Sequence, residues 1–400
     1  MKILRVISGT NLAEGGPIEG VRQITRILTA RGHVTEVASL DRDDAPWLSE
    51  SEFKVHALGT GRDSYFNAPR LTQWLADHAR DYDVVIQHGL WNASAFATMR
   101  GMRKAKRNYL VYTHGMLDPW FKHAYPLKHA AKQTLWFISE GRLLHGADYV
   151  LFTTEEERLA ARRSFWPSRY RERVVKYGTG DIRLDDAAQR AAEFRALLPQ
   201  LSDAPFLLFL SRIHPKKGCD LLVDAFAEIA AQRPELHLVI AGPDDSGLVP
   251  ELSARAERLG IAGRLHWPGM LKGDAKRGAF FASEAFVLPS HQENFGIAVA
   301  EAMASGKPVL LTDKVNIWRE VTGCGGGLVA GDDAAGVVSL LKGFLQLTPE
   351  QKAEMGAKAR AGFLTYFEIG AVADTLLEVL EESAARGPRG AAHVGMAQAS

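Results

Sequence analysis

The chain has 400 residues, of which 46% are hydrophobic and 24% are charged. This length suits two domains, each with its own core, and the composition excludes a largely disordered or fibrous protein. Residues 1–180 hold 26 Lys+Arg against 19 Asp+Glu, whereas the remainder holds 22 against 28, so the net charge of +1 conceals a basic first part that we expect to meet something anionic.

Short apolar runs alternate with longer amphipathic segments along the first 180 residues. The expected strands are Ile3–Ile7, Val34–Ala38, Val84–Gln87, Tyr109–Thr113 and Tyr149–Phe152, and the expected helices cover about 17–31, 71–80 and 127–144. This alternation predicts a parallel sheet with helices on both faces. We expect the first apolar run, Ile3–Ile7, to form a buried strand, because it is shorter than the apolar segment of a signal peptide. No apolar run is long enough to span a bilayer.

A second alternating series follows a polar, Ala-rich segment at 181–204, which we expect to connect two domains. Its expected strands are Phe206–Leu210, Leu236–Ala241, Arg264–Trp267, Ala285–Leu288 and Pro308–Leu311. The predicted fold class is therefore α/β, with two Rossmann-like, doubly wound domains at 1–180 and 205–366 that face each other across a cleft. The Gly/Ala-rich stretch 387–400 is expected to be a flexible tail. The two cysteines, Cys219 and Cys324, lack metal-ligand spacing, which indicates free thiols in a reducing compartment such as the cytoplasm.

Ligands of such sheets bind beyond the carboxyl ends of the strands. After the first strand, Gly15 and Gly16 precede a helix, where backbone amides can approach a phosphate or an acceptor, although the same glycines also fit a plain turn. His114 and Gly115 follow the strand 109–113. A lone histidine is more often structural, but this position favours contact with a ligand.

The stretch 100–145 combines nine Lys/Arg, against Asp118 and Glu140, with interleaved aromatic residues. These aromatics are Trp120, Phe121, Tyr125, Trp136 and Phe137. Such a surface suits peripheral contact with an anionic membrane and a lipid-diphosphate-linked acceptor. Amphipathic helices that merely cover a Rossmann-like sheet have a similar composition, so this alternative stays open.

In the second half, Arg212 and Lys217 lie in the loop between the strand 206–210 and the next helix. A helix amino terminus with two added cations suits a diphosphate, whereas a basic loop without a ligand is the plainer alternative. After the strand 285–288, Glu293 precedes a helix and Glu301 lies two turns along it. Carboxylates at these places can accept hydrogen bonds from a sugar and from a ribose diol.

These residues together resemble the family 4 retaining glycosyltransferases, which have the GT-B fold. The resemblance rests on Arg212, on Lys217-Gly218, on the strand ends at 241–243 and 267–269, on Glu293 and Glu301 with seven residues between them, and on Gly306-Lys307-Pro308-Val309. It covers most of residues 204–385 and, more weakly, the first domain. The family also has a Gly-Gly turn after its first strand and a histidine that approaches the donor sugar, which correspond here to Gly15, Gly16 and His114.

The resemblance implies a role for each matched residue. Arg212 and Lys217 would hold the donor diphosphate, Glu293 the transferred sugar with the backbone of Asn294, Phe295, Gly296 and Ile297, and Glu301 the ribose. The base would lie against Gly242, Met270 and Leu271. Asn294-Phe295-Gly296 departs from the more common Gly-Phe-Gly or Ser-Phe-Gly and leaves the sugar open. A closing helix at about 367–385 would return to the first domain.

The implied function is retaining transfer of a hexose from a UDP- or GDP-sugar to a hydroxyl of a glycan or lipid-linked glycan, in bacterial surface polysaccharide or lipopolysaccharide assembly. Glu293, His114, Lys217 and Arg212 would serve catalysis, and no cofactor or metal is expected. The Asp-x-Asp pairs at 41–43 and 81–83 are treated as chance. The enzyme would be cytoplasmic or peripheral on the inner face of the cell membrane.

Other functions remain open at this point. A nucleotide-sugar epimerase shares the fold and would convert its donor without an acceptor, and a non-catalytic nucleotide-sugar-binding protein would bind the donor only. A nucleic-acid binder lacks any supporting motif. A P-loop ATPase is disfavoured because no Gly-x-x-x-x-Gly-Lys-Ser/Thr occurs.

Overall fold

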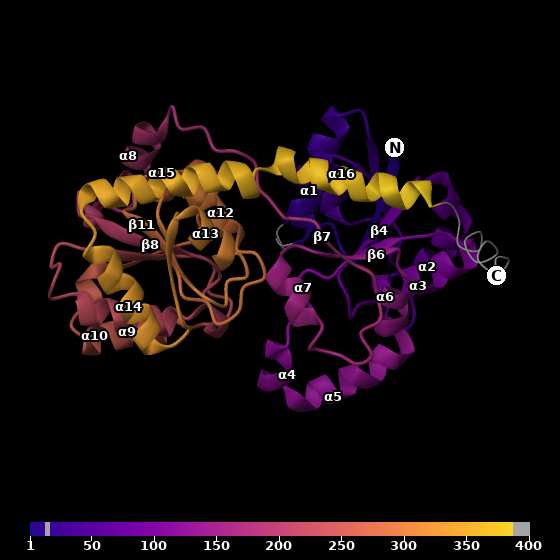
Figure 1. The fold of residues 1–400 in the computed structure, drawn as a ribbon, viewed down its shortest axis with the longest axis horizontal. Coiled ribbons are helices and arrows are strands. Elements are labelled where there is room, and N and C mark those ends of the chain that lie inside the picture. Colours follow the sequence, from indigo (N-terminus) through magenta and orange to yellow (C-terminus); the bar gives the residue numbers. More distant parts are fainter. Residues whose placement is uncertain (13–16, 387–400) are drawn as a thin grey trace, which may run out of the picture. The chain divides into compact units, whose positions relative to one another are not determined.

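The computed structural model describes residues 1–12 and 17–386, and it divides into two compact units, each built on one parallel sheet (Figure 1). Unit 1 comprises Met1–Tyr177 and the C-terminal residues from Ile369, and unit 2 comprises Gly178–Glu368. Gly15, Gly16 and the expected tail at 387–400 lie outside the described residues. Among the residues that the structure describes, no helix has the length and apolar character needed to cross a bilayer.

Unit 1 is a seven-stranded sheet with helices on both faces. The strands, in the order β3-β2-β1-β4-β5-β6-β7, are β3 Lys54–Ala57, β2 Val34–Ser39, β1 Lys2–Ile7, β4 Val84–His88, β5 Leu110–Tyr112, β6 Tyr149–Phe152 and β7 Glu172–Val174. The helices are α1 Pro17–Ala30, α2 Pro69–His78, α3 Ala93–Ala105, α4 Trp120–Ala124, α5 Pro126–Leu135, α6 Gly141–Gly146, α7 Glu155–Ala161 and α16 Ile369–Ala385.

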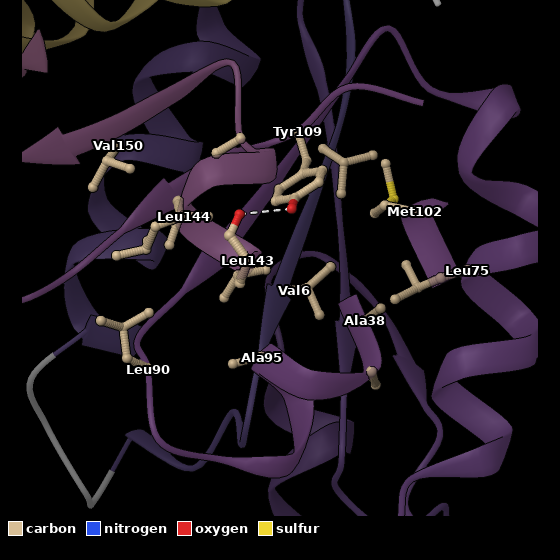
Figure 2. Close-up of a cluster of buried hydrophobic side chains, with 14 of the residues drawn as sticks. Val6, Ala38, Leu75, Leu90, Ala95, Met102, Tyr109, Leu143, Leu144 and Val150 are labelled. Atoms are coloured by element: carbon tan, nitrogen blue, oxygen red, sulfur yellow. Dashed lines mark hydrogen bonds between the residues drawn. The ribbon is translucent and has the colours of Figure 1, made fainter. Parts of the chain in front are cut away.

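Each face of this sheet has its own apolar core. On one face, side chains of β1, β4 and β6 pack against α2, α3 and α6, and the Tyr109 hydroxyl donates to the carbonyl of Leu143 at 2.7 Å (Figure 2). On the other face, Ile3 and Leu28 pack with Leu376 and Leu380. The last helix, α16, is therefore an integral part of the hydrophobic core of unit 1, although the whole of unit 2, Gly178–Glu368, separates it from the rest of unit 1 in the sequence.

Unit 2 is a six-stranded sheet, also with helices on both faces. The strands, in the order β10-β9-β8-β11-β12-β13, are β10 Leu265–Gly269, β9 His237–Ala241, β8 Phe206–Leu210, β11 Ala285–Leu288, β12 Val309–Thr312 and β13 Gly327–Ala330. The helices are α8 Ala187–Leu197, α9 Cys219–Ile229, α10 Val249–Arg258, α11 Gly273–Ala282, α12 Ile297–Ala304, α13 Trp318–Cys324, α14 Ala334–Leu345 and α15 Pro349–Tyr366.

The segment 181–204, expected as a connection between domains, instead contains α8, which belongs to unit 2. Phe194 of α8 is fully buried and packs against Phe206 of β8, with ring centroids 5.8 Å apart. Gly278 of α11 permits the close packing of these helices, because a Cβ there would lie 2.2 Å from the carbonyl oxygen of Arg190. Burial of a large aromatic ring explains why this polar segment is ordered.

The continuous helix expected at 127–144 is also different in the structure. It is divided into α5, a five-residue π-helix at Trp136–Glu140, and α6. Trp136 is buried and stacks on Phe165, with ring centroids 4.9 Å apart, whereas α5 has no buried residue. The wider turn therefore lets one aromatic side chain enter the core while the preceding helix stays on the surface.

Candidate functional site

The sheet of unit 2 changes strand order between β8 and β11. At such a point the connections leave the sheet in opposite directions, and the loops beyond the carboxyl ends of the two strands form a ligand-binding crevice. The loop after β8 carries Arg212 and Lys217, and the loop after β11 carries Glu293. The fold therefore brings three of the predicted site residues to one place.

Lys217 and Glu293 are in direct contact. The Lys217 side chain is largely buried, and its Nζ donates a short charge-assisted hydrogen bond to Glu293 Oε2. The two loops are held together by backbone contacts, because the amide of His291 donates to the carbonyl of Lys216 at 2.8 Å and the hydroxyl of Ser290 donates to the same oxygen at 3.0 Å. An ammonium group and a carboxylate are the groups that can bind a phosphate and hydroxyl groups, and the fold holds one of each here.

Two glycines allow the loops to approach this closely. A Cβ at Gly218, whose φ is +64°, would lie 2.1 Å from the carbonyl oxygen of Pro289. A Cβ at Gly242 would lie 1.7 Å from the carbonyl oxygen of Ser211, and the Gly242 amide donates to the carbonyl of Gly269 at 2.8 Å. Neither position has room for a side chain, so both glycines set the packing of the loops around the site.

The loop that carries Glu293 is fixed from its other side by the loop after β12. The Glu293 amide donates to the carbonyl of Lys314, and its own carbonyl accepts from the amide of Asn316, both at 3.0 Å. Gly296, with φ +77°, is the N-cap residue of α12, which begins at Ile297. The aromatic ring of Phe295 is buried and packs edge-on against Phe367, so any ligand contact of Phe295 would be made by its backbone.

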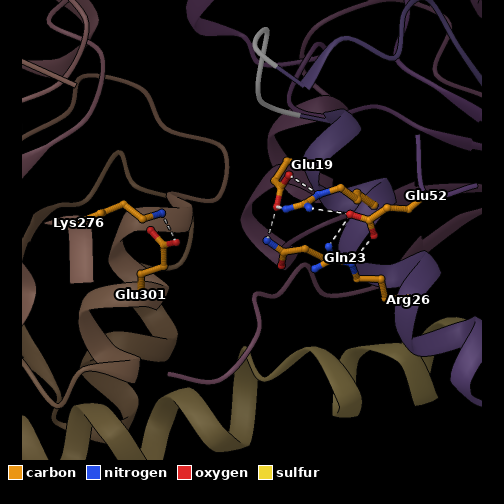
Figure 3. Close-up of polar contacts among 7 residues, drawn as sticks. Glu19, Gln23, Arg26, Glu52, Lys276 and Glu301 are labelled. Atoms are coloured by element: carbon orange, nitrogen blue, oxygen red, sulfur yellow. Dashed lines mark hydrogen bonds and ion pairs between the residues drawn. The ribbon is translucent and has the colours of Figure 1, made fainter. Parts of the chain in front are cut away.

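Glu301, expected at the ribose, forms an ion pair within unit 2. Lys276 of α11 places its Nζ 2.5 Å from Glu301 Oε1, and the Glu301 side chain is mostly buried (Figure 3). Lys276 was not predicted from the sequence, because a lysine in an amphipathic helix gives no signal of its own. The Glu301 carboxylate thus has a fixed orientation and a neighbouring ammonium group.

The other predicted residues of unit 2 lie nearer the surface. Arg212 is exposed, and within the described residues its side chain forms no ion pair. Met270 is also exposed, Leu271 is half-buried, and Asn294 accepts from the side-chain amide of Asn316 at 3.4 Å. Burial lowers the pKa of His214 in the loop after β8, and the neighbouring positive charges of Arg212, Lys216 and Lys217 lower it further.

In unit 1, His114 follows β5 and has a left-handed backbone, with φ +49°. Such a conformation is strained for a residue with a side chain and is concentrated at functional positions. Glu157 of α7 fixes the turn, because its buried carboxylate accepts from the amide of Gly115 at 2.7 Å and from the hydroxyl of Thr113 at 2.6 Å. Glu157 was not predicted from the sequence, since helix-starting glutamates are common.

The two Asp-x-Asp pairs make structural contacts. Asp41 accepts from the amide and hydroxyl of Thr10, at 2.9 and 2.7 Å, and from the indole of Trp47 at 3.1 Å. Asp83 accepts from the amide of Lys2 at 2.7 Å, at the amino end of β1. Over residues 1–12 and 17–386, no three His, Cys, Asp or Glu side chains are grouped as metal ligands.

Two family models match most of the chain. A model described as glycosyl transferase 4-like domain matches residues 15–178, and one described as glycosyl transferases group 1 matches residues 192–362. Among curated proteins, a D-inositol 3-phosphate glycosyltransferase of Streptomyces scabiei is 36% identical over 232 residues, which are 56% of this chain and 52% of that protein. The chain thus spans about half the length of such curated relatives.

Solved structures match over nearly the full length. Anabaena HepE in complex with UDP has a TM-score of 0.77 at 19% identity, covering 96% of this chain and all of that one. Sucrose-phosphate synthase of Thermosynechococcus elongatus has a TM-score of 0.76 at 20% identity, covering 97% of this chain and all of that one. At these identities the likeness concerns the fold, which is GT-B, with one Rossmann-like sheet in each unit.

Proposed function

Because this chain belongs to the family 4 glycosyltransferases of the GT-B fold, we propose that it transfers a hexose, with retention of configuration, from a nucleotide-diphosphate sugar to a hydroxyl of a glycan or lipid-linked glycan acceptor. One observation carries the proposal: Lys217 and Glu293 are joined in a charged contact at the point where the strand order of unit 2 changes. Lys217 would neutralise the diphosphate, and Glu293 would bind hydroxyls of the sugar.

The chemistry follows from the charges at the loop after β8. As the bond between sugar and diphosphate breaks, negative charge grows on the leaving phosphate, and Lys217 and the exposed Arg212 stabilise it. In a same-face attack the leaving phosphate oxygen accepts the proton of the acceptor hydroxyl. This route needs no metal and no carboxylate nucleophile, and we propose it for this enzyme. Glu301, orientated by Lys276, would bind the ribose diol.

A thermal-shift panel tests donor binding. Wild type, Glu293→Gln and the surface control Lys342→Met, on α14, are heated with UDP, GDP, ADP and their hexose conjugates, with and without chelator. A ligand at 100 times its Kd adds about 2.7 kcal/mol of stability. We expect a shift for one nucleotide, with or without chelator, and an extra sugar-dependent shift that Glu293→Gln loses and Lys342→Met keeps. No shift with any saturating nucleotide would contradict the proposal.

The proposed acceptor is membrane-linked, as in bacterial surface polysaccharide or lipopolysaccharide assembly, with the enzyme on the inner face of the membrane. Support comes from the surface of unit 1 around α4 and α5 (Figure 1). Large apolar side chains are exposed there beside Lys128, with Leu127 at 87% exposure and Trp166 at 73%. The others are Tyr125, Phe137 and Ile138. Cations and interfacial aromatics together favour anionic lipid surfaces.

Vesicle co-sedimentation tests this contact. Wild type should sediment with vesicles of anionic phospholipid at low salt and dissociate as salt is raised, because surface charges are screened beyond about 10 Å at 0.1 M. Leu127→Glu combined with Phe137→Glu should abolish sedimentation, whereas Leu259→Glu, a matched change at an exposed leucine of unit 2, should not. Wild type that stays in the supernatant at low salt would overturn the membrane proposal and leave donor transfer untouched.

A further inference from the structure

A buried arginine lies in the central strand of unit 1. Arg5 of β1 is 1% exposed, and burial lowers its pKa to about 10, so it remains a cation at neutral pH. No carboxylate pairs with it among the described residues, and its Nε and Nη2 have no hydrogen-bond partner there. A buried charge without a counter-ion reduces stability, so the residue calls for an explanation other than packing.

Arg5 begins a chain of contacts that ends at His114. Its Nη1 lies 3.2 Å from His88 Nε2, at the carboxyl end of β4, and His88 Nδ1 lies 3.0 Å from His114 Nε2. The Tyr112 ring lies nearly parallel to both imidazoles, with centroids 5.4 Å from each. Arg5 lies within β1, His88 is the last residue of β4 and His114 follows β5, and these three strands are neighbours in the sheet.

The direction of these hydrogen bonds follows from donor chemistry. A guanidinium has only donors, so His88 Nε2 must accept and the neutral His88 must carry its proton on Nδ1. That N–H then donates to His114 Nε2, and the proton of a neutral His114 must lie on Nδ1. Within the described residues no hydrogen bond engages His114 Nδ1, and the residue is half-buried, so Nδ1 is the ring nitrogen left for a ligand.

We propose that Arg5 and His88 are positioning residues, which hold His114 as a neutral imidazole with its proton on Nδ1, so that it donates a hydrogen bond to a phosphate or sugar oxygen of a ligand bound to unit 1. The nature of this ligand rests on the proposed function, whereas the proton arrangement does not. His114 consequently acts as a hydrogen-bond donor and not as a general base, because the only nitrogen that it turns to a ligand already carries a proton.

The surrounding charges agree with this arrangement. Burial lowers the pKa of His114 to about 4, helped by Arg5, and burial with Arg5 and His114 lowers the pKa of His88 well below its usual range. Among the described residues, Tyr112 of β5 and Tyr177 are further titratable groups that face the pair, and burial raises the pKa of each. The Glu157 carboxylate of α7 accepts a hydrogen bond from the amide of Gly115, and the negative charge of Glu19 of α1 raises the pKa of Tyr177 further.

Nuclear magnetic resonance of the ligand-free protein with ¹⁵N-labelled histidine tests the chain of hydrogen bonds from Arg5 through His88 to His114, which we call the relay. In wild type we expect His88 and His114, assigned with His88→Phe and His114→Gln, to stay neutral with protons on Nδ1 from pH 8 to pH 5. In Arg5→Met the constraint is lost, so His114 should populate both tautomers and titrate at higher pH. Ile3→Met, a buried change on the same face of β1, should leave both rings as in wild type. The His237 and His266 pair of unit 2 is an internal reference.

Two results would overturn the relay: a wild-type His114 whose proton lies on Nε2, or an Arg5→Met spectrum equal to that of wild type. If Arg5→Met fails to fold, the wild-type spectrum still decides. Kinetics then tests the ligand: Arg5→Met should lower kcat/KM for sugar transfer about 10–100-fold, by analogy with the loss of a hydrogen-bond partner of a metal-ligating histidine, and Ile3→Met should not. If the Nδ1 tautomer of His114 is confirmed but the protein turns over no donor, the proposed function is refuted and the relay is not.

Discussion

At the scale of single residues, the contact between Lys217 and Glu293 joins two opposite charges with little exposure to water. Their interaction is screened less than that of a surface pair, so a ligand phosphate that approaches Lys217 meets a cation already in place. Glu293 keeps the Lys217 ammonium fixed in the absence of the ligand. Each residue therefore orientates the other before any donor arrives.

Lys217→Met should lower kcat about 10²–10³-fold, the usual loss when one preorganised group that stabilises transition-state charge is removed. Steady-state turnover of the donor measures this. Lys342→Met, which removes a cation of unit 2 that pairs with Glu228 on the surface, is the matched control and should keep wild-type turnover. Equal kcat values for Lys217→Met and wild type would exclude Lys217 from the chemical step.

Gly218 offers a test of loop packing by a single methyl group. Gly218→Ala adds a Cβ 2.1 Å from the carbonyl of Pro289 at φ +64°, whereas Gly260→Ala meets no atom within 4 Å at φ +71°. The control isolates the backbone cost, about 1–2 kcal/mol. Chemical denaturation should show a larger loss for Gly218→Ala, and calorimetry should show weaker donor binding by that variant alone. Equal losses would mean that the loops do not need this close approach.

At the scale of elements, the Glu36 carboxylate of β2 interacts with side chains of the neighbouring strands β1 and β3. Burial opposes ionisation of Glu36, but hydrogen bonds from His56 at 2.6 Å and Tyr82 at 2.7 Å, with the charges of Lys2 and Lys54, lower its pKa to about 2. Because the folded pKa lies below the ordinary value of 4.5, this stability is present above pH 4.5 and is lost as the pH falls toward 2.

Thermal unfolding should therefore show wild type to be more stable than Glu36→Gln at pH 6, with a difference that shrinks between about pH 4.5 and pH 2. Tyr82→Phe removes one of the hydrogen bonds and should show the same trend with a smaller amplitude. A difference that does not change over this pH range would mean that the Glu36 carboxylate is not stabilised by these partners.

The elements that the sequence predicted well are those buried on both faces. Strands such as β8 and β11 are continuous apolar runs, and the structure confirms them within a residue or two. The edge strands β3, β7 and β13 were missed because they are only partly buried and their apolar runs are short. α8 was missed as a helix because its contact with unit 2 depends mainly on one buried ring, Phe194.

Some site residues could also be located from the sequence, because they follow strands with a clear apolar pattern. Lys217 and Glu293 follow strands that the apolar pattern locates, so their neighbourhood could be inferred from the sequence and the parallel topology. Their direct contact, and that of Lys276 with Glu301, depends on loop and helix packing that no local pattern encodes. Arg5 did carry a signal, a cation within an apolar strand, but its partner His88 is 83 residues away.

At the scale of the whole molecule, the C-terminal helix α16 completes the hydrophobic core of unit 1. Ile369, Ala373, Leu376 and Leu380 of α16 are buried against the sheet of unit 1, and Arg31 of that unit pairs with Asp374 at 2.5 Å. Neither the first 177 residues nor α16 contains the whole core. The C-terminal helix therefore contributes to folding of the unit that begins with the first residue of the chain.

Deleting the residues from Ile369 onward should destabilise unit 1 selectively, because it exposes one face of its sheet. Hydrogen exchange followed by mass spectrometry should show loss of protection in β1, β4 and β5 and retained protection in β8, β9 and β11. Deletion of 387–400 alone is the control and should change neither unit. Equal protection of unit 1 with and without α16 would refute this account of its core.

Transfer of a hexose with retention is tested most directly by a time course, followed by ¹H nuclear magnetic resonance, of a UDP- or GDP-hexose with the enzyme and a panel of sugar acceptors. Wild type should consume one donor, the first sugar product should keep the α configuration of that donor, and Glu293→Gln and Lys217→Met should be slow. A β-configured first product, an epimerised donor still joined to its nucleotide, or a bound donor that never changes would contradict transfer with retention.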